Sequence, residues 1–239
     1  MSIRVAAVAD IHLGEAQRGS YRPRLEGIEE RADVLLVGGD LTRHGTLDEG
    51  KIVAEEFRGL PIPVVFVLGN HDYHSDVEDE IIAVLREAGG IVLDDDAQTL
   101  LDGRLGLAGG KGFGGGFAGK SASEFGEPET KAFVRHTREI ADRWRIALKS
   151  LDTEYRVVLS HYSPVKETLA GEPPEIYPFL GSYLLAEAVD AEGADLIVHG
   201  HAHAGTEKGM TPGGIRVRNV ALPVLRRAYA TYCLGSEEC

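Results

Sequence analysis

The sequence predicts an α/β fold with a mainly parallel sheet. Short apolar runs at residues 3–9, 34–37 and 64–68 have the length of strands and few polar positions, which is typical of strands buried on both faces. Helical patterns at residues 21–31 and 47–58 separate these runs. Strands that alternate with helices in this order favour a parallel sheet with helices packed on it.

A third helix follows the third strand. Ser75 and Glu78 have the spacing of a capping box, so the helix is expected to begin at Ser75 and to run to residue 88, before Gly89 and Gly90. This helix completes a βαβα order across the first half of the chain.

The middle of the chain has a different pattern. Residues 91–93, 98–101 and 105–108 form short apolar runs with tight turns, which predicts antiparallel additions to the sheet. Residues 109–119 read GGKGFGGGFAG and lack the ending of a phosphate-binding P-loop. We interpret them as a flexible surface loop, with a mobile rim over an active site as the alternative.

The second half continues the alternation. Expected helices span 128–151 and 182–192, and expected strands span 155–159, 196–198, 215–220 and 229–234, with a hairpin at Pro212-Gly213-Gly214. No repeat and no linker rich in proline, serine or charge interrupts the chain. The sequence therefore predicts one domain over residues 1–239.

Composition excludes several classes of protein. The 239 residues carry a formal net charge of -13, which argues against a non-specific grip on nucleic acid. No apolar run approaches the ~18 residues that a membrane helix needs. The only cysteines are Cys233 and Cys239, which we expect to be a packed thiol and an exposed thiol. Low cysteine use and the absence of a secretory signal indicate a cytoplasmic protein.

Side chains that bind metals follow the predicted strands. They occur in five clusters: Asp10-Ile11-His12, Gly39-Asp40, Gly69-Asn70-His71-Asp72, Ser160-His161 and Gly200-His201-Ala202-His203. The carboxyl ends of strands in an open α/β sheet form one edge where ligands bind. Residues far apart in the sequence are therefore expected to converge there.

Local spacing and donor type refine this expectation. Residues i and i+2 of an extended segment point to the same side, which pairs Asp10 with His12 and His201 with His203. The glycines before Asp40, Asn70 and His201 permit sharp turns and close backbone approach. Carboxylate, imidazole and amide donors without thiolate suit Mn or Fe first, with Zn or Co as alternatives.

The ordered motifs resemble the calcineurin-like metallophosphoesterase superfamily, and they span Asp10 to His203. The resemblance implies a four-layer α/β/β/α sandwich, with two divalent metals at one sheet edge. It implies that Asp40 bridges the two ions. The first ion would be held by Asp10, His12, Asp40 and His203, and the second by Asp40, Asn70, His161 and His201.

The resemblance also implies an enzyme. Two metals ~3.5–4 Å apart share a water as a bridging hydroxide and clamp the phosphoryl oxygens during displacement. His71 would act on the substrate, by stabilising charge or protonating the leaving oxygen, and Asp72 would orient His71. Arg43 and His44, in the loop after Asp40, are candidate substrate contacts.

Other polar residues have simpler interpretations. His199 is expected to be a buried, hydrogen-bonded histidine, and His136 is expected to lie on the surface of a helix. The Asp94-Asp95-Asp96 run is interpreted as a solvated turn, since it lacks the spacing of a calcium loop.

The second motif ends in Asp72, and the first lacks the Gly-Asp-x-Val-Asp-Arg-Gly form of the protein phosphatases. The chain therefore resembles the phosphodiesterase-type branch more closely. We expect a small or cyclic-nucleotide-like diester as substrate. A homodimer is a possible assembly. The alternatives are a phosphomonoesterase acting on a small metabolite and a non-catalytic scaffold with the same fold.

Overall fold

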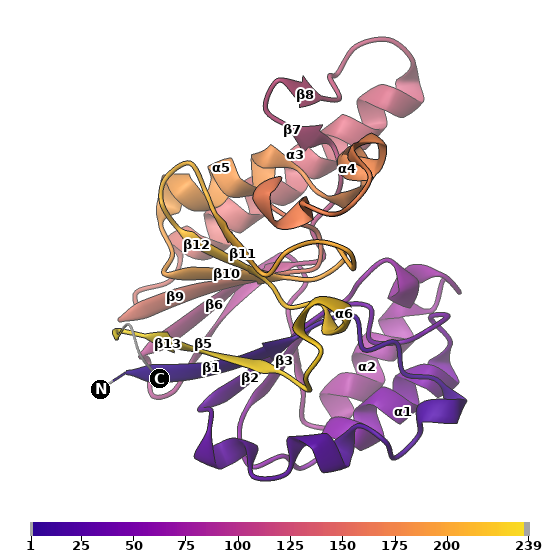
Figure 1. Cartoon of the computed structure of the whole chain (residues 1–239), viewed down its shortest axis with the longest axis vertical. Helices are drawn as coiled ribbons and strands as arrows, with labels where there is room; N and C mark the ends of the chain where they lie inside the picture. The colour runs from indigo at the N-terminus through magenta and orange to yellow at the C-terminus, as the bar shows by residue number, and fades with distance from the viewer. Residues whose placement is uncertain (1, 237–239) are drawn as a thin grey trace.

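The computed structural model describes residues 2–236, whose larger strands form two stacked sheets (Figure 1). The first sheet has the order β13-β1-β2-β3-β4. Its strands are β13 (Ala230–Leu234), β1 (Ile3–Val8), β2 (Val34–Gly38), β3 (Val64–Val67) and β4 (Ile91–Val92). All neighbours are parallel except β13, which runs antiparallel to β1.

The second sheet has the order β11-β12-β10-β9-β6-β5. Its strands are β11 (Lys208–Met210), β12 (Arg216–Asn219), β10 (Leu196–His199), β9 (Tyr155–Ser160), β6 (Leu105–Gly110) and β5 (Asp96–Leu100). The four inner strands are parallel, and β11 and β5 close the edges in the antiparallel sense.

Helices cover the outer face of each sheet. Helices α1 (Leu47–Phe57) and α2 (Glu78–Glu87) lie against the first sheet, whereas α3 (Pro128–Lys149) and α5 (Tyr183–Glu192) lie against the second (Figure 1). The apolar runs of the inner strands fill both faces: on β1, Val5 and Ala7 face the other sheet, while Ala6 and Val8 face the helices. The predicted α/β/β/α sandwich is confirmed.

Most predicted elements are found. The expected helices at 47–58, 128–151 and 182–192 correspond to α1, α3 and α5, and Ser182 caps α5 by accepting from the amide of Leu184. Thr46 and Glu49 form a capping box at α1. The tail hairpin is β11 with β12, and the last strand is β13. Short helices α4 (Tyr177–Leu180) and α6 (Leu222–Leu225) were not predicted.

Three local predictions were wrong. Residues 21–31 form two 3-10 turns, η2 (Arg22–Leu25) and η3 (Ile28–Glu30), because the buried Glu56 carboxylate binds the amides of Tyr21 and Arg22 and holds the chain out of a continuous helix. Helix α2 begins at Glu78 and not at Ser75, whose hydroxyl donates to the carbonyl of His44. Strand β4 is parallel to β3, not antiparallel.

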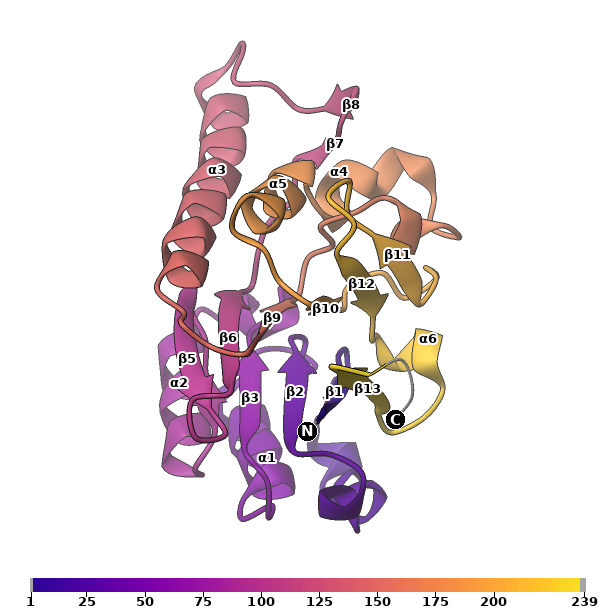
Figure 2. The ribbon, with the colours of Figure 1, turned by 90° about the vertical axis from the view of Figure 1, so that its left-hand side faces the viewer.

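Most of the glycine-rich segment is packed, so the predicted flexible surface loop is wrong for residues 109–117. Residues 109–117 are buried apart from the partly buried Lys111 and Phe113. The segment continues from β6 into the hairpin of β7 (Gly116–Phe117) and β8 (Lys120–Ser121), which Figure 2 shows near α4. A Cβ at Gly109 or Gly114 would lie 2.0 Å or 2.4 Å from a backbone oxygen, so glycine is required for close packing there.

Two further predictions concern acids and thiols. Asp95 is not solvated: its carboxylate accepts from the Trp144 indole at 2.8 Å and pairs with Arg143 at 2.6 Å. Cys233 is disulfide-bonded and not a free thiol, while Cys239 lies outside the described residues. None of the helices in the described part of the chain is both long and apolar enough to traverse a lipid bilayer.

Candidate metal centre

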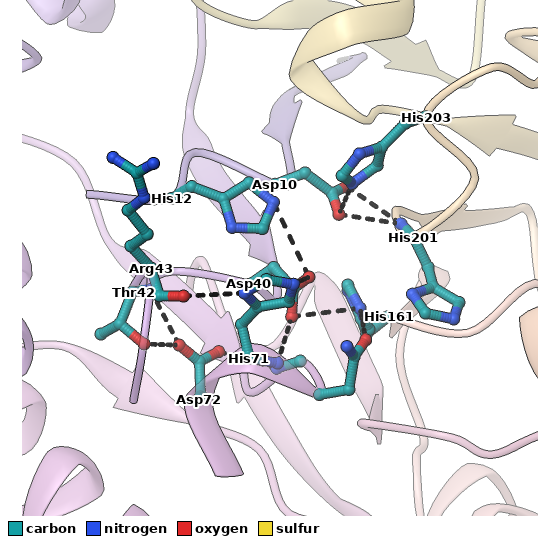
Figure 3. A network of polar contacts seen from close by, with 12 residues as sticks. Asp10, His12, Asp40, Thr42, Arg43, His71, Asp72, His161, His201 and His203 are labelled. Atoms are coloured by element: carbon teal, nitrogen blue, oxygen red, sulfur yellow. Dashed lines mark hydrogen bonds and ion pairs between the residues drawn. The ribbon is translucent and has the colours of Figure 1, made fainter. Parts of the chain in front are cut away.

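The five clusters of metal-type side chains meet where the carboxyl ends of both sheets come together (Figure 3). Asp10 and Asp40 follow β1 and β2 of the first sheet, while His161 and His201 follow β9 and β10 of the second. The ligand atoms form two groups, each with its atoms within 4.8 Å of one another: Asp10, His12, Asp40 and His203, and Asp40, His161 and His201. The structure thus brings together the two sets that the family resemblance implied, with Asp40 in both.

The first group is held mainly by its own side chains. Asp10 is buried, and its Oδ1 lies 2.9 Å from Nε2 of His203. Burial raises the pKa of Asp10 to about 6, and the hydrogen bond to Asp10 raises the pKa of His203. His12 Nε2 lies 3.8 Å from Asp40 Oδ2. The His12 and His203 side chains are 24% and 43% exposed, so this group faces the open side of the site.

The second group is mostly buried and is fixed by backbone carbonyls. Nδ1 of His161 donates to the carbonyl of Gly38 at 2.9 Å, and Nε2 of His201 donates to the carbonyl of Phe179 at 3.1 Å. Each bond selects a tautomer and leaves the other ring nitrogen free to bind a metal. Burial lowers the pKa of His161 well below its ordinary value and that of His201 to about 3, so both rings are neutral.

The arrangement of lone pairs fits a cation. Because Nδ1 of the neutral His161 ring is the donor, its Nε2 carries a lone pair, and this atom faces Oδ1 of Asn70 at 3.0 Å and Oδ1 of Asp40 at 3.4 Å. Acceptor atoms so close repel one another unless a positive charge lies among them. Asn70 thereby joins the second group, and the oxygen and imidazole donors suit a divalent metal.

Ligand loops turn sharply at glycines and at the ligands themselves. A Cβ at Gly69 would lie 2.1 Å from Asp40 Oδ1, and one at Gly200 would lie 2.3 Å from Asp10 Oδ2, which confirms the predicted close approach. The loops are not extended, because Asp10, His12, Asp40 and His201 have φ of 59°, 44°, 49° and 70°. Left-handed backbone breaks the i, i+2 alternation, so His201 and His203 enter different groups and not the same one.

His71 lies beside the ligands on the open side. Its amide donates to Asp40 Oδ1 at 2.8 Å, and its Nδ1 donates to the Arg43 carbonyl at 2.8 Å. Its Nε2 then points toward Asp40 Oδ2, 3.9 Å away, and its ring packs edge-on to His12. The side chain is 43% exposed, so Nε2 is accessible to a substrate.

Asp72 does not orient His71 as predicted. Its buried carboxylate accepts from the amides of Leu41, Thr42 and Gly69 and from the Thr42 hydroxyl. The carboxylate therefore clamps the loop after β2 to the loop after β3, and the backbone of Arg43 orients His71 instead. Burial and the nearby charge of Asp40 raise the pKa of Asp72 to about 6.

The two candidate substrate contacts differ in placement. The Arg43 side chain is exposed and extends away from the ligand carboxylates in Figure 3. His44 is held away from the ligands, because its Nδ1 lies 3.0 Å from Oε1 of Glu49 and its amide donates to the same carboxylate. The structure does not bring His44 into either ligand group.

Sequence reasoning missed the residues that support the second group. The Lys111 carbonyl accepts from the amides of His161 and Tyr162, and the Tyr162 ring packs 4.4 Å from the His201 ring. Position next to His161 is the only sequence signal for Tyr162, and Lys111 stands out only as the cation in a glycine run.

His199 is buried and bonds the Gly200 carbonyl and the Thr168 hydroxyl, and His136 is exposed on α3, as predicted for both.

Comparison with known proteins gives a family and a fold. A family model described as calcineurin-like phosphoesterase matches residues 3–205. No curated protein matches the chain. The phosphopantetheinyl hydrolase of Mycobacterium tuberculosis is similar in structure, with a TM-score of 0.69 and 16% identity over 98% of this chain and 96% of that one.

Two other solved structures share the fold. The Thermus thermophilus protein TT1561 has a TM-score of 0.56 and 14% identity, over 97% of this chain and 99% of that one. A putative 5'-nucleotidase from Staphylococcus aureus has a TM-score of 0.58 and 16% identity, over 92% of this chain but 48% of its own.

Proposed function

This chain belongs to the calcineurin-like phosphoesterase family, a family of dinuclear metal-dependent hydrolases, and we propose that it hydrolyses a small phosphodiester of the cyclic-nucleotide type. The observation that carries the proposal is the pair of ligand groups that share Asp40, each with its ligand atoms within 4.8 Å. Every ligand position that the family motif requires is filled, which argues against a non-catalytic scaffold.

The chain contributes positioning and proton transfer. The two ions, when bound, supply Lewis acidity toward the phosphoryl oxygens and make a nucleophile from water at neutral pH. Asp10, His12, Asp40 and His203 would hold the first ion, and Asp40, Asn70, His161 and His201 the second. Mn or Fe is our first choice of metal.

His71 is the proposed general acid. Its Nδ1–H is committed to the Arg43 carbonyl, so any proton it transfers must lie on Nε2, the nitrogen directed toward the ligand groups. A proton at Nε2 would be given to the leaving oxygen, a role worth about 10²–10⁴-fold in rate. The carbonyl fixes the ring without adding negative charge, whereas a carboxylate orienter would raise the basicity of the ring.

A diester is favoured over a monoester by the motif ending in Asp72, which resembles the phosphodiesterase-type branch. Among similar structures, the phosphopantetheinyl hydrolase of Mycobacterium tuberculosis matches this chain over nearly the full length of both. The putative 5'-nucleotidase supports the alternative, a monoesterase, although this chain spans only about half of that protein.

A substrate screen tests the proposal. Protein reconstituted with Mn is assayed on bis(p-nitrophenyl) phosphate, on p-nitrophenyl phosphate, and on 2',3'- and 3',5'-cyclic AMP. We expect the highest kcat/KM on a diester and no activity in Asp40→Ala prepared in parallel, which controls for contaminating phosphatases. Preference for the monoester would establish the alternative, and inactivity on all esters with metals bound would support the scaffold.

The role of His71 is tested by the leaving group. His71→Gln removes the proton donor, so we expect a rate loss of about 10²–10⁴-fold on a nucleotide or alkyl ester, whose alkoxide needs the proton. The loss on a nitrophenyl ester should be smaller, because nitrophenolate leaves without one. Elemental analysis should show unchanged metal. Equal losses on both esters would indicate a purely electrostatic role, and metal loss would make His71 a ligand.

A further inference from the structure

Lys111 is fixed beside the second ligand group. It follows β6 directly, and its carbonyl accepts from the amides of His161 at 3.1 Å and Tyr162 at 3.0 Å. Gly112, the next residue, packs against β9 and α5: a Cβ at this position would lie 3.0 Å from the Ser160 hydroxyl and 3.2 Å from Leu185. Lys111 therefore has a defined backbone position next to a metal-type histidine.

Its ammonium group is surrounded by aromatic rings. Nζ lies 4.9 Å from the ring centre of Tyr73, 4.9 Å from that of Phe113 and 5.4 Å from that of Tyr162. Within residues 2–236, no carboxylate forms an ion pair with Nζ and no protein oxygen accepts a hydrogen bond from it. Aromatic faces attract a cation but accept no strong hydrogen bond, so the three N–H donors of this group are left for another partner.

The rings connect this ammonium to both sides of the candidate centre. Tyr73 ends the short 3-10 turn η4 (His71–Tyr73) that carries His71, and the Tyr162 ring packs on His201. Lys111 thus contacts both sides: its carbonyl accepts from the amide of His161, and its ammonium lies over the Tyr73 ring in the turn that carries His71. A phosphoester held at the two ligand groups would therefore lie next to this cation.

We propose that Lys111 binds a non-bridging phosphoryl oxygen of the substrate. The inference rests on the proposed function. The carboxylates of Asp95, Asp94, Asp40 and Glu78 act on this ammonium only through space. A partly buried ammonium without a hydrogen-bond acceptor is costly, and a phosphoryl oxygen supplies the acceptor that the described residues lack. Lys111 would then set affinity for the anionic group, whereas His71 acts on the leaving oxygen.

The alternative role is purely structural. In that case the ammonium only ties the glycine segment to Tyr73 and Tyr162 through the ring faces. A structural lysine would affect thermal stability and would leave phosphate affinity at constant metal content unchanged. Binding of inorganic phosphate separates the two roles without requiring turnover.

The experiment is calorimetric titration of inorganic phosphate into Mn-loaded protein. Lys111→Met keeps the apolar stem and removes the charge, and we expect its Kd for phosphate to rise about tenfold to a hundredfold, as for loss of a charged hydrogen bond. Lys111→Arg should retain most of the affinity. Lys51→Met, at an exposed lysine paired with Asp48, is the matched control and should bind as the wild type does.

A second variant and a kinetic readout keep the test decisive. Lys111→Gln replaces the first variant if the first loses metal, and metal content is measured for every protein. In the uncharged Lys111 variants, KM for the dianion p-nitrophenyl phosphate should rise more than KM for the monoanion bis(p-nitrophenyl) phosphate. The kcat of these variants should change little on either substrate. Wild-type phosphate affinity in an uncharged variant with full metal content overturns the inference, as does a wild type that binds no phosphate.

Failure of the proposed function gives a different result. A wild type that binds phosphate but hydrolyses no ester sinks the proposed function, while the Kd comparison still reports on Lys111. If the wild type hydrolyses esters but the Lys111 variants bind phosphate with the wild-type Kd, only the role proposed for Lys111 is wrong.

Discussion

The two ligand groups share Asp40 but hold their other side chains in different ways. In the first group, Asp10 and His203 bind each other, and His203 is 43% exposed. In the second group, His161 and His201 are each tied to a backbone carbonyl from a different part of the chain. The second group is therefore prearranged to receive a cation, whereas the first must exchange a proton for one.

The largest expected effect comes from the shared carboxylate. Asp40→Ala should reduce bound Mn from two ions per chain toward none, because both groups lose a ligand. His12→Ala should lose mainly the first ion and His161→Ala mainly the second. Elemental analysis after dialysis gives the stoichiometries, and full occupancy in Asp40→Ala would rule out a bridging role.

A smaller effect is expected from pH. The pKa of His203 is raised by its bond to Asp10, so the ring stays protonated to a higher pH than a free histidine, and a metal must displace that proton. Affinity for the first ion should then fall as pH falls through that pKa, by about tenfold per pH unit. The pKa values of His161 and His201 are lowered by burial, so the second ion should be retained to lower pH.

Calorimetric titration of Mn at pH 8, 7 and 6 separates the two events. We expect two ions at the highest pH and one at the lowest. If the affinities for both ions fall equally with pH, the two groups do not differ in proton competition.

The smallest effect concerns backbone strain, which both groups carry. His12 and His201 have φ of 44° and 70°, where a residue with a Cβ is disfavoured. In chelator-treated protein, urea titration should therefore give a free energy of unfolding about 1 kcal/mol higher for His12→Gly than for His12→Ala. The same pair of variants at His201 should show a similar difference. Equal stabilities at one position would place the strain in the other group alone.

The sequence predicted most of the strands because those at 34–37 and 64–67 are apolar on both faces. It also predicted that Asp40 and His161 would meet, because residues at strand ends share an edge. It did not show that this edge belongs to two sheets, since a strand carries no mark of the sheet it joins.

Side-chain partners were harder to predict. The wrong role for Asp72 arose because adjacency to His71 says nothing about which backbone amides a buried carboxylate will reach, and here they are Leu41, Thr42 and Gly69. The glycine run has no pattern of apolar side chains, so the sequence alone predicts a loop there. The function of its glycines is to let the segment approach β9 and α4, a tertiary property that no local pattern records.

The left-handed backbone at Asp10, His12, Asp40 and His201 has an evolutionary consequence. At each position glycine would relieve strain, so drift under selection for folding alone would replace these residues. Such replacement would erase the ligands and raise stability in the same step. A descendant that abandons catalysis should therefore be recognisable by glycine or asparagine at these positions before any change in its core.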